Sequence, residues 1–395
     1  MRVLVSSTSG YGHVLPMVPL ARAMLARGHD VLWATSADAA ARVRGAGIET
    51  ADAGMTETEI GPVRADLRHA RAGLPPEELA AYVFPRMFGA ARTPPMLAAL
   101  LPIARQWAPD LLVHEQGEFA APLVGTELGV PHVTHAFGGA TPAETVAAAA
   151  ERVAGLWAAL GRDMPAYAGC YEHLYLDIFP PSLRTVPLAH IRDVQPLRPV
   201  SYTGDPTAPL PSGLAGDDDR PLVYLTLGTV QDRSTVLRPV VAALAALDLR
   251  LLVTVGPLGD PDALGPQPSN VVVERYVPQT AVLPLCAAVV SHAGSGTVLG
   301  AAALALPQVC LPQGADQFRN ACGIVRAGAG VALHPDQATP DAVAQAVHEV
   351  LTRPEHRVGA GEVRAEIEAM PAPADVVTRL EELVSPARAA SSGRS

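Results

Sequence analysis

The chain contains 395 residues, of which 49% are hydrophobic, and its formal net charge is −10 at pH 7. This length allows two domains of ordinary size with buried cores. The acidic balance and the absence of a basic run in the sequence argue against nucleic-acid binding and against attachment to an anionic membrane surface. The sequence holds no uninterrupted apolar run of about 18 residues, so we expect no membrane-spanning helix.

The four cysteines show no CxxC spacing, and the chain opens directly into an apolar strand pattern without the features of a signal peptide. Cys286 and Cys310 lie in apolar runs, so we expect both to be buried thiols. Together these features predict a reduced, cytoplasmic protein.

The first part of the chain alternates strand and helix patterns, in a domain expected over residues 1–206. The expected strands cover residues 3–6, 31–34, 109–113 and 130–134. The expected helices cover residues 14–27, 37–46 and 142–160. Strands and helices that alternate at this spacing predict a parallel, doubly wound sheet.

Two stretches of this domain have a less regular pattern. Residues 56–73 mix charge and glycine without a clear period, so we expect a loop or a lid over a bound ligand. Residues 77–101 are rich in helix formers but are interrupted by prolines. Four large apolar residues of this second stretch either line a pocket or fill the core: Tyr82, Phe84, Met87 and Phe88.

A proline- and glycine-rich linker is expected over residues 207–220, and its Asp217, Asp218 and Asp219 are expected to form a solvated loop rather than a metal site. A second α/β domain is expected over residues 221–370. Residues 371–385 are expected to form a C-terminal helix that packs back on the first domain, and residues 386–395 a flexible tail.

The second domain repeats the strand and helix pattern of the first. Its expected strands cover residues 222–226, 251–255, 271–274, 288–291 and 308–311. Its expected helices cover residues 235–247, 296–304, 318–327, 340–351 and 358–370. A second parallel sheet follows from this alternation.

A glycine-rich turn follows the apolar strand at residues 288–291. It contains His292, Gly294, Ser295, Gly296 and Thr297, and a helix is expected to begin within it. Free backbone N–H groups and the positive helix end meet at such a turn, and glycine lets a phosphate approach closely. The turn therefore predicts an anion site, with a plain βα turn as the alternative.

The N-terminal strand leads into Gly10-Tyr11-Gly12-His13. The third glycine of a dinucleotide fingerprint is missing, and the next strand ends without the acidic residue that would bind a ribose, which argues against an NAD site. At a helix start the dipole disfavours the charged form of His13, and a neutral imidazole is what a general base requires. Glu115, at the end of another expected strand, can hold such a histidine in one tautomer, although a structural histidine is the alternative.

Three further segments of the second domain are expected at strand ends. They are Gly228-Thr229, Val277-Pro278-Gln279 and Gln313-Gly314-Ala315-Asp316-Gln317. Asp316 and Gln317 offer a carboxylate and an amide, which together can bind several neighbouring hydroxyl groups. This combination suits a sugar.

Five motifs in this order, GxGH, TLGT, VPQ, HAGSGT and GADQFRNA, resemble those of family 1 glycosyltransferases of the GT-B fold. The chain is most similar to actinomycete enzymes that decorate antibiotic aglycones, such as those of calicheamicin assembly. The resemblance covers nearly the whole chain and departs at Ala293, where relatives usually carry glycine. It implies two Rossmann-like, doubly wound parallel-sheet domains that face each other across a cleft.

The resemblance also implies roles for particular residues. His13 deprotonates the acceptor hydroxyl with Glu115 as its acidic partner, and Gly12 joins the four apolar residues of segment 77–101 on the acceptor side. The nucleotide is held by Gly228, Thr229, Val277, Pro278, Gln279, His292, Gly294, Ser295, Gly296 and Thr297. The sugar is held by Gln313, Gly314, Asp316 and Gln317.

These roles together predict an inverting glycosyltransferase. It moves a sugar from a dTDP- or UDP-sugar to a small, polyketide-like natural product, as a monomer or homodimer. We expect no metal and no cofactor, because fixed hydrogen-bond donors can stabilise the leaving diphosphate. A sugar-nucleotide epimerase or hydrolase on the same fold, or a non-catalytic auxiliary partner, is the alternative.

Overall fold

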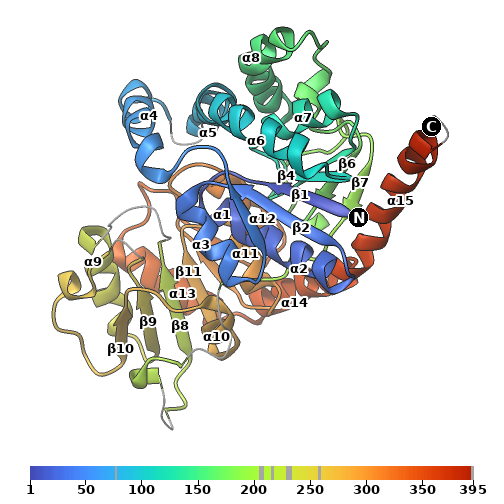
Figure 1. Ribbon diagram of the computed structural model, residues 1–395. Coiled ribbons are helices and arrows are strands. Elements are labelled where there is room, and N and C mark those ends of the chain that lie inside the picture. Colours follow the sequence, from blue (N-terminus) through green and yellow to red (C-terminus); the bar gives the residue numbers. More distant parts are fainter. Residues whose placement is uncertain (76–77, 204–208, 215–217, 228–233, 257–258, 393–395) are drawn as a thin grey trace. The chain divides into compact units, whose positions relative to one another are not determined.

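A computed structural model describes residues 1–75, 78–203, 209–214, 218–227, 234–256 and 259–392. The chain divides into two units, each with its own core. Unit 1 contains Met1–Phe179, Val186–Arg198 and Met370–Ser395, and unit 2 contains Pro180–Thr185 and Pro199–Ala369. Each unit is built on one parallel sheet covered by helices, so the expected α/β fold class is confirmed (Figure 1).

The sheet of unit 1 has seven parallel strands in the order β3-β2-β1-β4-β5-β6-β7. The strands are β1 (Arg2–Ser6), β2 (Asp30–Thr35), β3 (Glu49–Asp52), β4 (Leu111–Glu115), β5 (His132–His135), β6 (Leu174–Asp177) and β7 (Val194–Pro196). In the register of the central strands Ser6 lies opposite His114, and Glu115 lies opposite His135. The carboxyl ends of β1, β4 and β5 are therefore neighbours.

The helices of unit 1 follow its strands along the chain. They are α1 (Tyr11–Val14), η1 (Leu15–Met17), α2 (Val18–Ala26), α3 (Ala37–Gly45), α4 (Glu57–Ala70), α5 (Leu79–Phe84), the π-helix η3 (Pro85–Arg92), α6 (Thr93–Trp107), α7 (Ala120–Leu128), α8 (Ala143–Ala159), η4 (Ala166–Gly169) and α15 (Pro373–Ser392).

Prolines divide two stretches of unit 1 into successive helical segments. The single helix expected over residues 14–27 consists of α1, η1 and α2, and Pro16 and Pro19 each lie in the first turn of a new segment. Pro85 likewise begins η3, and Pro94 lies in the first turn of α6. Proline fits these positions because the first-turn N–H groups of a helix have no partner within the helix.

The loop expected over residues 56–73 was wrong, because Glu57–Ala70 forms helix α4. The alternative, a lid over a bound ligand, stays a prediction. Thr56 and Glu59 make a capping box, in which the Thr56 N–H donates to Glu59 Oε2 at 2.8 Å and the Glu59 N–H donates to Thr56 Oγ1 at 3.3 Å. Acidic residues in the first turn and basic residues in the last turn also stabilise the helix, because they interact favourably with its dipole. Only Ile60 of this helix is buried, so its sequence has no clear apolar period.

Unit 2 has six parallel strands in the order β10-β9-β8-β11-β12-β13. The strands are β8 (Leu222–Thr226), β9 (Arg250–Thr254), β10 (Val271–Glu274), β11 (Ala288–Ser291), β12 (Gln308–Cys310) and β13 (Gly330–Ala332). The α-helices are α9 (Ser234–Ala245), α10 (Gln279–Val282), α11 (Ser295–Ala302), α12 (Gln317–Arg326), α13 (Pro340–Thr352) and α14 (Pro354–Ala369). The 3-10 helices are η5 (Pro181–Leu183), η6 (Ser212–Leu214), η7 (Pro261–Leu264) and η8 (Leu283–Leu285).

The C-terminal helix α15 belongs to unit 1 and packs against α2 (Figure 1). Its Glu381 carboxylate bridges Arg27 Nη2 at 3.0 Å and His29 Nε2 at 2.9 Å. The helix extends through Ser392, beyond the expected end of the helix, and residues 393–395 of the expected tail lie outside the described residues.

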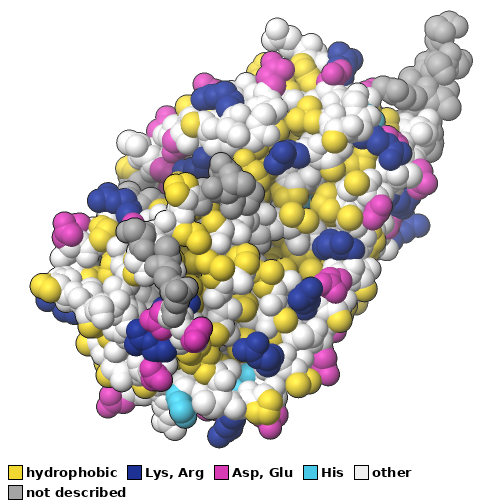
Figure 2. Space-filling model, turned by 90° about the horizontal axis from the view of Figure 1, so that it is seen from below, with side chains coloured by type: hydrophobic (Ala, Val, Ile, Leu, Met, Phe, Trp, Pro, Cys, Tyr) yellow, Lys and Arg dark blue, Asp and Glu magenta, His cyan; other side chains and the backbone are white. Residues whose placement is uncertain are grey.

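The structure also bears on the expectations for surface charge, buried thiols, membrane spans and the acidic loop. Figure 2 shows arginine and carboxylate side chains interspersed on the face that it draws. Cys286 and Cys310 are buried, as expected. Among the described residues, no helix combines the length and the apolar character needed to cross a bilayer. Of the expected acidic loop, Asp217 lies outside the described residues, and Asp218 pairs with Arg220 at 2.6 Å.

Candidate active site

The structure brings His13 and Glu115 together at the carboxyl end of the unit 1 sheet. His13 lies in α1, and Glu115 is the last residue of β4. His13 Nδ1 and Glu115 Oε1 are 3.0 Å apart. The Glu115 side chain is fully buried, whereas 21% of the His13 side chain is exposed. The imidazole can therefore meet a ligand while its carboxylate partner stays away from water.

Neighbouring donors hold the Glu115 carboxylate in its ionised form. Thr8 Oγ1 donates to Glu115 Oε1 at 2.8 Å, and the Gly117 N–H donates to Oε2. Burial on its own would raise the pKa of Glu115, but the neighbouring His13 and these hydrogen bonds outweigh it and hold the pKa below its ordinary value. An ionised carboxylate accepts a hydrogen bond from the protonated Nδ1 of His13, which leaves Nε2 as the basic nitrogen.

Glycine at position 10 makes room for the His13 ring. A Cβ atom on Gly10 would lie 2.9 Å from His13 Cδ2, closer than such atoms approach in proteins. Gly12 is exposed, and a Cβ atom there would meet nothing within 4 Å. Contact with the His13 ring therefore explains why position 10 is glycine. Among the described residues, no contact explains the glycine at position 12.

A row of aromatic rings reaches the His13 imidazole. The ring centroid of His13 lies 4.5 Å from that of Phe137 and 5.2 Å from that of Phe88, and Phe88 lies 4.8 Å from Phe84. Phe84 and Met87 are buried, whereas Phe88 and Phe137 are partly exposed. Of the four apolar residues singled out in the sequence, two are thus core residues and Phe88 borders the histidine.

Tyr82, the fourth of these residues, contacts an arginine. The Arg86 guanidinium stacks over its ring at 3.8 Å from the centroid, and Arg86 Nη1 also donates to the Tyr82 carbonyl at 2.9 Å. This cation–π pair holds the partly exposed tyrosine along its own helix.

A buried arginine lies close to the same strand end. Arg92 is 7% exposed, its Nη1 donates to Ser9 Oγ at 3.0 Å, and its Nη2 lies 3.6 Å from Glu57 Oε1. Ser9 Oγ in turn donates to Glu57 Oε1 at 2.5 Å. These contacts tie the loop before His13 to η3 and to the first turn of α4.

Glu118 is a second buried carboxyl group near Glu115. It accepts hydrogen bonds from Ser6 Oγ at 2.9 Å and from the N–H groups of Ala120 at 2.5 Å and Ala121 at 3.1 Å, which begin helix α7. Burial nevertheless dominates and raises its pKa to about 7. Glu118 thus changes its charge near neutral pH, whereas Glu115 stays ionised.

The glycine-rich turn of unit 2 joins β11 to the start of α11. Ala293 adopts a left-handed conformation with φ of 61°, and Gly294 caps α11 in an extended conformation. A Cβ atom on Gly294 would lie 2.5 Å from His292 Nε2, so only glycine fits there without moving the ring. The turn is stabilised by hydrogen bonds from Ala293 N–H to Ser291 Oγ at 3.0 Å and from Asn320 Nδ2 to Ala293 O at 2.9 Å.

Asp316 lies beside this turn. Its Oδ2 atom accepts hydrogen bonds from Ser295 Oγ at 2.5 Å and from Asn320 Nδ2 at 3.0 Å. Gln317 Oε1 accepts from the N–H groups of Gln313 at 2.8 Å and Gly314 at 3.1 Å. Gln313, Gly314 and Gln317 are therefore joined by hydrogen bonds, whereas Asp316 is joined to Ser295 of the predicted anion loop.

The VPQ segment also reaches the anion loop, through Gln279 Nε2, which donates to Thr297 Oγ1 at 3.0 Å. Val277 is buried, and Pro278 precedes the first residue of α10. Gly296 lies in the first turn of α11. Gly228 and Thr229 lie outside the described residues.

Family models match both halves of the chain, and named relatives match most of it. Family models described as the erythromycin biosynthesis protein CIII-like N-terminal and C-terminal domains match residues 80–228 and 238–383. The L-demethylnoviosyl transferase of Streptomyces niveus is 34% identical over 342 residues, which cover 85% of this chain and 86% of the relative. The elloramycin glycosyltransferase ElmGT of Streptomyces olivaceus is 33% identical over 401 residues, which cover 96% and 97%.

A solved structure agrees over the whole chain. The glycosyltransferase SsfS6 of Streptomyces sp. SF2575, complexed with thymidine diphosphate, has a TM-score of 0.78 and 28% identity, and the match covers 97% of this chain and 99% of that one. The chain is a family 1 glycosyltransferase of natural-product biosynthesis. Its fold is GT-B, and its activity depends on a nucleotide sugar, as the sequence motifs predicted.

Three residues near the predicted sites of the glycosyltransferase were missed by reasoning from the sequence. Phe137 follows β5, whose end neighbours Glu115, so its position after a strand was an available signal. Asn320 lies four residues after Asp316 on one turn of α12, and that spacing within GADQFRNA was also readable. Arg92 gave no signal, because nothing in an arginine's sequence context announces its burial.

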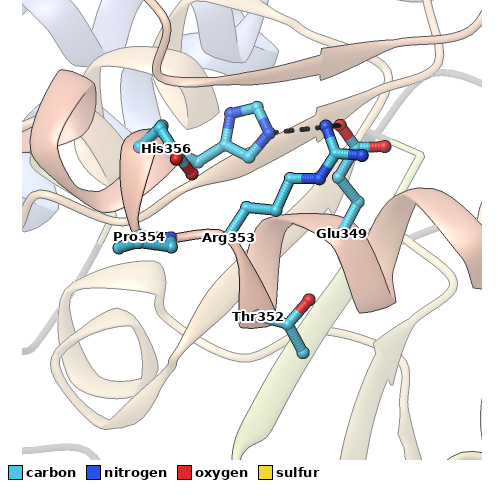
Figure 3. Close-up of a pocket in the computed structure, with 6 residues that line it drawn as sticks. Glu349, Thr352, Arg353, Pro354 and His356 are labelled. Carbon is cyan, nitrogen blue, oxygen red and sulfur yellow. Dashed lines mark ion pairs between the residues drawn. The ribbon is translucent and has the colours of Figure 1, made fainter.

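An open pocket of about 520 Å³ lies in unit 2 of the glycosyltransferase, at the junction of α13 and α14. Figure 3 shows the residues that line this cavity. In it, Glu349 pairs with Arg353 at 3.0 Å and with His356 at 3.5 Å. None of the predicted site residues lines this cavity, so it has no part in the site described above.

Proposed function

We propose that the enzyme transfers a sugar with inversion, from a dTDP-sugar to a hydroxyl group of a small natural-product aglycone. The acceptor oxygen forms a bond to the anomeric carbon, the bond from that carbon to the diphosphate breaks, and the acceptor proton passes to His13 Nε2. The 3.0 Å contact between His13 Nδ1 and the buried Glu115 carries this proposal. Such a pair holds the tautomer and stabilises the imidazolium that forms.

We assign the diphosphate to the glycine-rich turn of unit 2. His292, Gly294, Ser295, Gly296 and Thr297 surround the start of α11, where backbone N–H groups and the helix dipole favour an anion. These fixed donors stabilise the leaving diphosphate, and no metal ion is needed for that task. Gly228 and Thr229 belong to the same proposed set.

Thymidine diphosphate is the donor nucleotide that the comparisons support, since SsfS6 was solved with it. Val277, Pro278 and Gln279 are proposed to contact the base. Gln313, Gly314, Asp316 and Gln317 are proposed to hold the sugar, because a carboxylate and an amide offer acceptors and donors to neighbouring hydroxyl groups.

For the acceptor we propose a polyketide-like molecule that lies against the partly exposed rings of Phe88 and Phe137. These two rings flank the His13 imidazole, so a hydroxyl group at Nε2 brings the rest of the molecule onto them. The buried ring of Phe84 packs against Phe88, and Met87 is buried in the same helical stretch. Gly12 and Tyr82 are assigned to the outer part of the acceptor surface.

The H13A variant tests the assignment of the base. Loss of a positioned general base lowers kcat by about 10²- to 10⁴-fold, while the affinity for dTDP, measured by calorimetry, should stay unchanged. H29A is the matched control, because His29 also pairs with a glutamate, at 2.9 Å, in the same unit. Turnover by H13A at the rate of H29A would refute the base. Release of free sugar or an epimerised donor without acceptor would refute transfer itself.

A further inference from the structure

A second cluster of ligating side chains lies at the opposite edge of the unit 1 sheet. His132 is the first residue of β5, and His173 immediately precedes β6. Because Val133 lies opposite Leu174 in these paired strands, the two histidines are neighbours at the amino ends, with ring centroids 4.5 Å apart. Glu115, in contrast, lies at a carboxyl end.

Glu172 completes a three-residue set with these histidines. Its Oε2 atom lies 4.0 Å from His132 Nε2, and one ligand atom from each of the three residues lies within 4.8 Å of the others. Ligands of a tetrahedral zinc ion are about 3.4 Å apart at bond lengths near 2.1 Å. The Glu172 side chain is 46% exposed, so its carboxylate has room to move toward the two imidazoles.

A strained turn adds a carbonyl oxygen to this set. Tyr167, Ala168 and Gly169 of η4 all have positive φ, at 56°, 53° and 80°. Two of them are not glycine, and L-residues adopt this conformation only where the surrounding structure holds them in it. The turn places the Gly169 carbonyl oxygen beside the cluster, 2.9 Å from His132 Nε2, where it takes part in a hydrogen bond.

Each histidine of the cluster has one ring nitrogen that makes no hydrogen bond within the described residues. Over the described ranges, His132 Nδ1 and His173 Nδ1 are buried and have no hydrogen-bond partner. A buried imidazole without a partner on one nitrogen can shift its proton there when the other nitrogen binds a metal. The hydrogen bond between His132 Nε2 and the Gly169 carbonyl therefore does not prevent coordination through Nε2.

We propose that His132, Glu172 and His173, with the Gly169 carbonyl, form a binding site for one zinc-type divalent cation. Two imidazoles and a carboxylate suit Zn²⁺ and Ni²⁺ and disfavour Mg²⁺, which prefers oxygen ligands. The ion joins the start of β5 to the end of the connection that returns through α8 and η4. It stabilises unit 1 and takes no part in the transfer reaction.

Calorimetric titration of the EDTA-treated full chain with ZnCl₂ tests this site. We expect one Zn²⁺ per chain, no heat from MgCl₂, and at least tenfold weaker Zn²⁺ binding in the variants Glu172→Gln and His173→Gln. These residues are exposed or partly exposed, so their variants should fold, whereas substitution of the buried His132 would not be informative. Circular dichroism of each variant checks folding.

D336N is the matched control, because His334 and Asp336 form an exposed pair at 2.6 Å in unit 2. It should bind Zn²⁺ as the unmodified chain does. The proposal fails if the unmodified chain does not bind Zn²⁺, if Glu172→Gln and His173→Gln bind it equally well, or if D336N loses it. Transfer activity after EDTA treatment should be unchanged, and its loss would contradict the purely stabilising role.

Discussion

The Glu115 carboxylate is the residue on which the proposed base depends. In E115Q the side-chain amide has one oxygen for three donors, His13, Thr8 and Gly117, so its NH₂ group must face one of them. The neutral amide also gives no charge stabilisation to the imidazolium. We expect kcat to fall by about 10²- to 10⁴-fold, with dTDP affinity unchanged, in steady-state assays.

The control for E115Q is E381Q, which removes the carboxylate partner of His29. Its kcat should stay within about twofold of the unmodified enzyme, because the His29–Glu381 pair joins α15 to the end of α2 and does not contact His13 or Glu115. Equal kcat values for E115Q and E381Q would show that His13 acts without its carboxylate partner.

Glu118 makes the stability of the enzyme depend on pH. Burial raises its pKa from 4.5 to about 7, so the folded state binds more protons than the unfolded state between these values. The free energy of unfolding therefore falls through this group as pH rises from 4.5 to about 7. At about 1.36 kcal/mol per pKa unit, the full effect is on the order of 3 kcal/mol.

The E118Q variant isolates this contribution, because glutamine stays neutral at every pH. Urea unfolding at several pH values from 5 to 8 should show a smaller decrease in stability for E118Q than for the unmodified enzyme. The difference between the two curves cancels the other titrating groups. Parallel curves would mean that Glu118 does not titrate in this range.

At the scale of one element, the β11–α11 turn offers a matched pair of substitutions. Ala293 has φ of 61°, which costs an L-residue roughly 1–2 kcal/mol, so A293G should leave stability equal or raise it by about 1 kcal/mol. In G294A the new Cβ would lie 2.5 Å from His292 Nε2 and displace the ring. We expect dTDP to bind at least about tenfold more weakly to G294A, a change of about 1.4 kcal/mol.

Calorimetric titration with dTDP and urea unfolding of both variants check this pair. The affinity of A293G should be within about twofold of the unmodified enzyme, because its backbone already has the conformation that glycine prefers. Normal dTDP affinity in G294A would remove His292 and this turn from the proposed diphosphate site.

Several elements with a clear apolar pattern were predictable from the sequence, although the buried elements β6 and α7 were not among those expected. The buried strands β1, β4, β8 and β11 are short apolar runs, and the structure has them where the sequence placed them. The edge strands β3 and β7 are partly exposed and carry no such run. Helix α4 is stabilised by its capping box and charges rather than by an apolar face, so periodicity could not reveal it.

The candidate site divides in the same way. Glycine-rich turns after strands were readable, because strand, turn and helix start are adjacent in the chain. The contact between His13 and Glu115 joins residues that are 102 positions apart, so it depends on strand order, which a single sequence does not contain. The burial of Arg92 and the raised pKa of Glu118 likewise follow from packing between distant segments.

At the scale of the whole molecule, the chain enters unit 1 again after unit 2 is complete. Helix α15 follows α14 of unit 2 directly but packs on α2 of unit 1. Its Val377 and Leu380 side chains are fully buried. The stability of unit 1 therefore depends on a segment that follows unit 2 in the chain, whereas the proposed donor site depends on unit 2.

The L380A variant separates these two dependencies. Truncation of a fully buried leucine costs about 2–5 kcal/mol, so the unfolding transition of unit 1 should move to lower urea concentration. Saturating dTDP, at 100 times its Kd, should still add about 2.7 kcal/mol to the stability of the unit that binds it. Unfolding of unit 1 should be followed by tryptophan fluorescence, because Trp33, Trp107 and Trp157 all lie in unit 1. Binding of dTDP should be measured separately, by calorimetric titration. If L380A weakened dTDP binding as much as it destabilised unit 1, the donor site would depend on unit 1 as well, and its assignment to unit 2 alone would be wrong.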